Sequence, residues 1–202
     1  MVERAKNGVM VITDEDNAYL SKHFDIPIGS KNYSSMYKVI LDSFISNDNS
    51  PIPTEFLNNT KLITYLMIAN AEKEILIYSD KYNTQLYDDP LIKETLLDKV
   101  FDGDVKVRVI LKNKGKFDKF FKGLDIPVRY LDLKNDFSGL YVDSGFMLCD
   151  KSNRCDASYK KKGDNMTFVG SRSNFNVGSV GVSVVRDSYK KLYSKCYVFD
   201  KV

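Results

Sequence analysis

Between residues 59 and 131, apolar segments with helical spacing alternate with short apolar runs of the length of a strand. Three strands are expected, at residues 74–79, 105–111 and 126–131. One helix precedes each strand, and the three helices begin at about residues 59, 90 and 116. Such alternation requires crossover connections between strands. The pattern therefore predicts an α/β protein with a mostly parallel mixed sheet and helices on both of its faces.

Residues 1–58 do not follow this pattern. A strand is expected at residues 8–13, and a helix from Ser34 or Ser35 to about residue 46. Residues 47–53 contain asparagine, aspartate, serine and two prolines. Such a run disfavours regular structure, because proline lacks a backbone donor and restricts the residue before it. We therefore predict an N-terminal extension, residues 1–58, that packs on a main lobe, residues 59–202.

The last third of the chain contains two more short apolar runs, at residues 145–150 and 166–169, with a hydrophilic loop between them. The second run leads into a polar turn at residues 170–174. Further on, an apolar strand is expected at residues 180–185 and a helix at residues 187–196. Polar groups at the carboxyl end of a strand commonly bind ligands in α/β proteins. The turn is therefore a candidate anion site.

Asp150 ends the first of these runs, and Gly170-Ser171 follow the second. With the order of the elements, these residues resemble one lobe of the phospholipase D superfamily, whose signature H-x-K-x-x-x-x-D precedes a G-S-x-N motif. Counting back from Asp150 puts Asp143 at the histidine position and Gly145 at the lysine position. Neither residue supplies the nucleophilic imidazole that the family's chemistry needs. The resemblance, over residues 59–202, implies this fold without its standard active site, and hence no enzyme.

The resemblance also implies a homodimer. An active site of this family takes one signature from each of two lobes, and the sequence contains a single lobe with no internal repeat. For Asp150 two interpretations stay open. It is either a remnant of the former acid site or a turn residue that ends a strand.

The charge of the chain is divided unevenly. The net charge of +3 combines −7 over residues 1–104 with +10 over residues 105–202. A basic half that follows an acidic half suggests a surface that faces a polyanion, or subunits that dock through opposite charges. An uneven scatter of solvated charge is the simpler alternative.

Three groups of residues are candidates for phosphate contact: the turn after residue 169, a lysine run in the hydrophilic loop, and a strip of lysines interleaved with phenylalanines. The candidates are Ser171, Arg172, Ser173, Asn174, Lys160, Lys161, Lys162, Lys112, Lys114, Lys116 and Lys119. Phe117, Phe120 and Phe121 share helical spacing with Leu124, which favours a place in the core. The lysines of the strip remain available for contacts with a nucleic-acid backbone.

The leading hypothesis is a non-catalytic protein that binds nucleic-acid backbone, DNA or RNA, or another phosphorylated partner. One alternative is a protein-binding inhibitor or adaptor, phage or plasmid encoded, that uses the fold as a scaffold. The other is a phosphodiesterase or nuclease in which Asp143, Asp150 and a bound metal replace the missing histidine.

No cofactor or metal site is expected, because the three cysteines lack metal-ligand spacing. Cys149 and Cys196 lie among apolar residues and are expected to be small core residues. The only histidine, His23, has no catalytic partner in view. The sequence has no secretion signal and no apolar run of about 18 residues, so a cytoplasmic protein is expected, or one of the host cytoplasm if virus-encoded.

Overall fold

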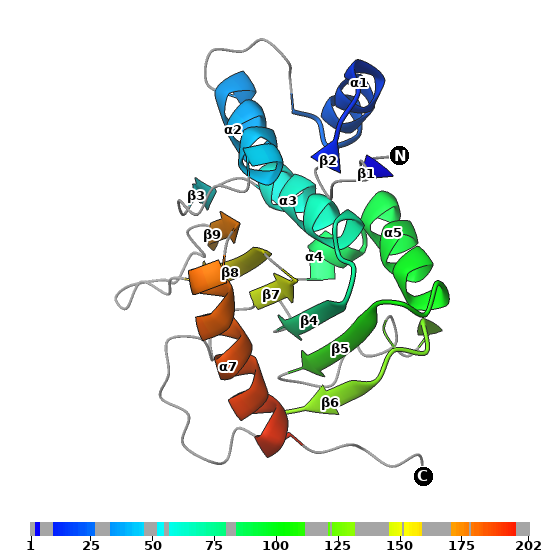
Figure 1. The fold of residues 1–202 in the computed structure, drawn as a ribbon, viewed down its shortest axis with the longest axis vertical. Coiled ribbons are helices and arrows are strands. Elements are labelled where there is room, and N and C mark those ends of the chain that lie inside the picture. The colour runs from blue at the N-terminus through cyan, green and yellow to red at the C-terminus, as the bar shows by residue number, and fades with distance from the viewer. Residues whose placement is uncertain are drawn as a thin grey trace, which may run out of the picture.

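The computed structural model contains a seven-stranded mixed sheet with the order β3-β9-β8-β7-β4-β5-β6 (Figure 1). Its strands are β3 (Ile52–Thr54), β4 (Glu74–Ser79), β5 (Lys106–Leu111), β6 (Val128–Tyr130), β7 (Phe146–Cys149), β8 (Ser152–Ser158) and β9 (Ser171–Val177). The structure describes residues 3–4, 10–26, 33–46, 52–54, 57–79, 84–111, 121, 123–131, 146–150, 152–158, 171–177 and 179–196. The α/β class and the mixed sheet are as predicted.

Parallel pairing is confined to β4, β5 and β6. The chain passes from β4 to β5 through α4 (Thr84–Tyr87) and α5 (Pro90–Phe101), and a crossover of this kind leaves two strands parallel. The other four strand pairs are antiparallel. β7 and β8 are joined by a tight turn at Asp150, which is possible only between antiparallel strands.

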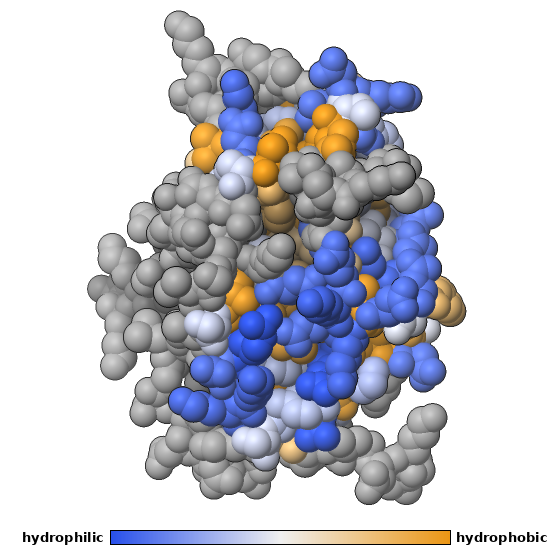
Figure 2. All heavy atoms as spheres, viewed as in Figure 1, coloured by the Kyte–Doolittle hydropathy of each residue, from blue (hydrophilic) through white to orange (hydrophobic). Residues whose placement is uncertain are grey.

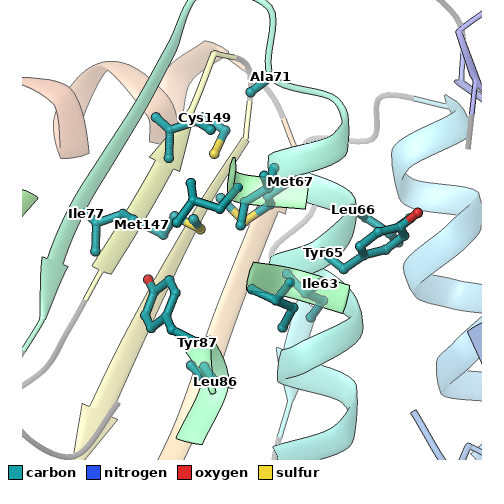
Figure 3. Close-up of a cluster of buried hydrophobic side chains, with 14 of the residues drawn as sticks. Ile63, Tyr65, Leu66, Met67, Ala71, Ile77, Leu86, Tyr87, Met147 and Cys149 are labelled. Atoms are coloured by element: carbon teal, nitrogen blue, oxygen red, sulfur yellow. The ribbon is translucent and has the colours of Figure 1, made fainter. Parts of the chain in front are cut away.

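One face of the sheet packs against α3 (Leu57–Ala69) and α5. Alternate residues of β4, among them Ile75 and Ile77, point to this face and are fully buried. In Figure 3, Met67 of α3 lies next to Met147 of β7, while Tyr65 points toward α2 (Tyr33–Ser46). Because α3 lies between the sheet and α2, it is buried on nearly all sides and needs no polar face.

The opposite face of the sheet packs against α7 (Ser179–Lys195). Four residues of α7, at intervals of three or four, are buried against the sheet: Val182, Val185, Tyr189 and Leu192. The strand predicted at residues 180–185 is therefore wrong, since these residues form the first turns of this helix. Their β-branched content favours a strand locally, but the helical spacing continues to Leu192 and the sheet offers an apolar surface to match it. Helices cover both faces, as predicted.

The first part of the chain forms β1 (Glu3–Arg4), β2 (Met10–Val11), α1 (Asp14–His23) and α2. The four residues after Thr13 were expected to close a strand, but they are the first turn of α1. The Thr13 side chain accepts from the Asp16 backbone N–H at 3.1 Å, and Asp16 Oδ2 accepts from the Thr13 backbone N–H at 3.1 Å. This reciprocal capping box begins the helix. Leu20, Phe24 and Tyr37 belong to the same apolar core as α3.

Three further details differ from the sequence predictions. Residues 52–54, at the end of the predicted linker, form the edge strand β3, where Pro53 is tolerated because an edge residue can do without its donor. Residues 152–158, within the predicted polar loop, form β8. The core position expected for Phe101 from its helical spacing is wrong, since this residue ends α5 and is 80% exposed. The strand predicted at residues 166–169 lies outside the described residues.

The helix predicted at residues 116–122 also lies largely outside the described residues, with Phe121 as an exception. Phe121 is fully buried, and its ring centroid lies 5.6 Å from that of Tyr87. Leu124 is buried as well. The prediction that Phe121 is a core residue, not a nucleic-acid stacking group, is therefore confirmed.

Candidate functional site

The parallel strands β4, β5 and β6 end at one edge of the sheet, which we call the carboxyl edge. The antiparallel strands continue this edge: Tyr78 near the end of β4 pairs with Phe146, the first residue of β7, and Phe146 pairs with Cys155 of β8. Beyond Cys155, Ser158 pairs with Ser171, so β8 ends and β9 begins at the same edge. Ligands of α/β proteins commonly bind outside the carboxyl ends of strands.

The segments that carry the predicted phosphate contacts are attached to this edge. Lys112 directly follows the last residue of β5, and Asp143 and Gly145 shortly precede β7. The connection from β8 to β9 carries Lys160, Lys161 and Lys162. These residues lie outside the described part of the chain, as do Lys114, Lys116 and Lys119. The contacts of these lysine side chains with phosphate remain a prediction. The strands that flank the lysines, however, do end or begin at the carboxyl edge.

Ser171, Arg172, Ser173 and Asn174 were predicted to form a turn, and this prediction is wrong. They are the first four residues of β9, which pairs with β8 on one side and with β3 on the other. Glycine, serine and asparagine are typical of turns. Here, however, two neighbouring strands supply backbone partners, and tertiary pairing overrides the local preference.

Asp150 lies at the opposite edge of the sheet, at the turn between β7 and β8. Its carboxylate accepts the backbone N–H groups of Glu72, Lys73 and Glu74 at the start of β4. Its own backbone has a φ of 38°, in the left-handed region that aspartate tolerates better than most residues. This geometry agrees with the turn-residue interpretation of Asp150, and it separates Asp150 from the other predicted site residues.

Arg186 of α7 reinforces this turn. Its Nε donates to Glu74 Oε1 at 2.7 Å, and its Nη2 donates to the Asp150 carbonyl oxygen at 3.1 Å. One guanidinium thus links α7, the start of β4 and the hairpin turn, with the planar multi-donor geometry that distinguishes arginine from lysine.

A buried carboxylate, Asp89, joins the N-terminal layer to the main lobe. Asp89 Oδ1 lies 2.9 Å from His23 Nε2, and Asp89 Oδ2 lies 3.2 Å from Lys61 Nζ. Asp89 also caps α5 by accepting from the Leu91 backbone N–H at 3.2 Å. The sequence predicted the cap but not the two side-chain partners, because His23 is 66 residues away along the chain and no local pattern indicates the contact.

Burial alone would raise the pKa of Asp89, but hydrogen bonds and charge from His23 and Lys61 outweigh it and hold the pKa below its ordinary value. A depressed carboxyl pKa stabilises the fold above the unfolded-state pKa and loses this effect as the pH falls through the folded-state pKa. We expect Asp89→Asn to lower the free energy of unfolding by about 1–2 kcal/mol at pH 7. Urea unfolding should show this difference shrinking as the pH falls below about 4; a difference that does not shrink at all in acid would contradict the assignment.

Two arginines and a tyrosine form a cluster that the sequence reading missed. The Cζ atom of Arg129 lies 3.9 Å from the centre of the Tyr193 ring, and that of Arg108 lies 5.2 Å from it. All three side chains are half-buried. A signal was present: Lys106 and Arg108 alternate with Val107 and Val109, which indicates a strand whose second face carries basic residues.

Among the residues that the structure describes, no group of three or more histidine, cysteine, aspartate or glutamate side chains is placed to hold a metal ion. In the same residues, no helix has the length and apolar character needed to cross a membrane. Cys149 is buried and Cys196 half-buried. Burial raises the pKa of the Cys196 thiol to about 11, against the opposing effect of Arg129.

The mixed sheet with helices on both of its faces gives the chain an α/β fold that is similar to that of a solved phospholipase D family member. Nuc from Salmonella typhimurium, a phospholipase D family member, matches 76% of this chain over 100% of its own length, with 11% identity and a TM-score of 0.53. NucT from Helicobacter pylori matches 74% of this chain over 100% of its own, with 14% identity and a TM-score of 0.50. At these identities the likeness concerns the fold.

A third solved structure is TrmBL2, an archaeal chromatin protein described as showing a novel mode of DNA binding. It matches 73% of this chain with 18% identity and a TM-score of 0.49, and the chain spans 52% of its length. No model of a known protein family and no curated protein sequence matches this chain.

Proposed function

We propose that this chain is a non-catalytic phospholipase D-like protein that binds the backbone of nucleic acid at its carboxyl edge, as a homodimer. The observation that carries the proposal is that the two most basic connections of the chain are attached to this one edge. These connections, residues 112–127 and 159–170, together contain eight basic and three acidic side chains. Residues 132–145, which join β6 to β7 at the same edge, add three aspartates and one lysine, so the excess of positive charge remains.

A concentration of lysine and arginine at one edge suits a polyanion, because each phosphate contact releases condensed counterions and binding then depends strongly on salt. The absence of catalysis is supported by the position of the only histidine. His23 lies in α1 and contacts Asp89, and neither residue belongs to a strand of the carboxyl edge. Asp150, the other residue that a rearranged active site would use, is engaged by three backbone N–H groups at the opposite edge.

The proposal is tested by titrating labelled single-stranded and double-stranded DNA and RNA with the protein at low and high salt. Binding that weakens steeply with salt, without release of product from the oligonucleotide, is the expected result. Absence of binding at low salt would rule the proposal out, and cleavage would overturn its non-catalytic part. Sedimentation at several protein concentrations tests the homodimer.

Replacing Lys160, Lys161 and Lys162 together with glutamine is expected to weaken binding at least tenfold at low salt. The slope of log K against log salt concentration should fall by about two to three, since each lysine on a phosphate contributes about one. The matched control removes three exposed lysines away from the carboxyl edge, Lys22→Gln, Lys38→Gln and Lys73→Gln. If both triple variants lose the same amount of binding affinity, binding depends on the net charge of the protein and not on the lysines at the carboxyl edge.

One observation favours a second candidate function, binding of a protein partner by the N-terminal layer. A groove of about 510 Å³ lies between β2, α1 and α2, lined by Ile12, Asp14, Asn17, Ala18, Tyr37, Lys38, Leu41, Asp42 and Ile45. Exposed apolar residues gather near it (Figure 2). The acidic first turn of α1 suits a partner helix that carries basic residues beside an apolar stripe. Capture from a nuclease-treated lysate, lost when exposed Ile45 of the groove is replaced in Ile45→Lys, tests this candidate.

A further inference from the structure

Among the described elements, α7 packs on one face of the sheet, and at the outer strands β5 and β6 it leaves Arg108 and Arg129 half-buried. α7 buries Leu76, Tyr78 and Ile110 of β4 and β5. Beside them, on the same face, Arg108 of β5 and Arg129 of β6 lie against the ring of Tyr193 near the end of α7. Figure 2 shows hydrophilic residues gathered over α7, β5 and β6 on this side of the molecule.

Arg108 and Arg129 share one ring: their Cζ atoms lie 5.2 Å and 3.9 Å from the centre of Tyr193, so the two positive charges are at most the sum of these distances, 9.1 Å, apart. Within the described part of the chain, no carboxylate forms an ion pair with either arginine; Glu74, on the same side, is paired with Arg186. Like charges that are half-buried repel each other more strongly than they would in bulk water. An anion that contacts both guanidinium groups would relieve this repulsion.

The cluster is also held in place before any ligand arrives. Arg129 Nη1 donates to the Tyr193 carbonyl oxygen at 3.4 Å, and the Tyr193 ring stacks on buried Tyr189 with 5.8 Å between centroids. A guanidinium that lies over an aromatic ring keeps its N–H groups free along its edge. Two of these parallel N–H groups can donate to two oxygens of one phosphate. The exposed side chains of Lys190 and Lys191 on α7 add positive charge nearby.

We propose that Arg108 and Arg129, positioned by Tyr193, form a second phosphodiester-binding site, which holds the nucleic acid where it passes from the carboxyl edge onto the outer strands β5 and β6. This inference rests on the proposed function and extends its contact surface. The two places adjoin, because Arg129 pairs with Ile110, one residue before the end of β5. Arginine on phosphate with an aromatic ring beside it is a general way to hold a nucleic-acid strand without reading its sequence.

The test compares Arg108→Gln/Arg129→Gln with the control Lys22→Gln/Lys38→Gln, which removes the same charge from the N-terminal layer. With a labelled single-stranded oligonucleotide at low salt, the arginine variant is expected to bind about tenfold more weakly per arginine, with a salt slope lower by one to two. Unchanged affinity and slope, while the unaltered protein binds, would overturn the site and leave the proposed function standing. No binding by the unaltered protein would overturn both.

A measurement on the unaltered protein does not depend on how the variants fold. A photoreactive thiothymidine in the oligonucleotide is expected to crosslink to the peptide that contains Tyr193. Crosslinks found only in other peptides would overturn the inference. The charge-retaining variant Arg108→Lys/Arg129→Lys should keep the dependence of log K on log salt concentration but bind several-fold more weakly. Lysine keeps the positive charge, but it lacks the two parallel N–H donors of arginine. A merely structural role of the arginines would leave the affinity of this folded variant unchanged.

Discussion

Replacing Asp150 with alanine is expected to lower the free energy of unfolding by about 3 kcal/mol, although the residue lies at a turn. The substitution leaves three backbone N–H groups, those of Glu72, Lys73 and Glu74, without their charged acceptor. It also places alanine at a φ of 38°, which costs about 1 kcal/mol more than aspartate there. Urea unfolding followed by circular dichroism measures the change.

Asp125 provides a matched control for this prediction. It has a φ of 55°, is exposed, and is another aspartate in the left-handed region. Asp125→Ala therefore carries the backbone cost alone, about 1 kcal/mol. If the two variants lose equal stability, the contacts of the Asp150 carboxylate contribute nothing measurable, and its place as the anchor of the β7–β8 turn would have to be abandoned.

The second large effect is expected for Leu66→Ala in α3. Leu66 is fully buried where α3 is enclosed by the sheet and α2 (Figure 3). Removing its side chain costs the lost burial and leaves a cavity, together about 3 kcal/mol. Thermal and urea unfolding should both show the loss.

Phe101→Ala is the comparison, because it removes a larger apolar side chain that is 80% exposed. The change in stability should stay within about 0.5 kcal/mol, as for other exposed positions. A loss comparable to that of Leu66→Ala would mean that the end of α5 packs against the rest of the chain.

The local elements that depend on near neighbours could be predicted from the sequence. The predicted strand at residues 74–79 coincides with β4, and Asp89-Pro90 begin α5 as expected, because a cap and a proline act within one turn. Among the segments with candidate phosphate contacts, the lysine strip was expected to follow the strand at residues 105–111, and β5 does end at Leu111, whereas residues 171–174 lie inside β9. The meeting of these segments at one edge follows from strand order and register, which involve pairs of residues far apart along the chain.

Where the predictions failed, a distant partner decided the outcome. Residues 171–174 have the composition of a turn but form a strand between β3 and β8, and residues 180–185 have the composition of a strand but form a helix against the sheet. Composition and periodicity alone determined the α/β class, the charge asymmetry and the cap of α5. Only the tertiary structure decided the antiparallel half of the sheet, the partners of Asp89 and the two arginines on Tyr193, because hydrogen bonding and burial depend on which surfaces meet.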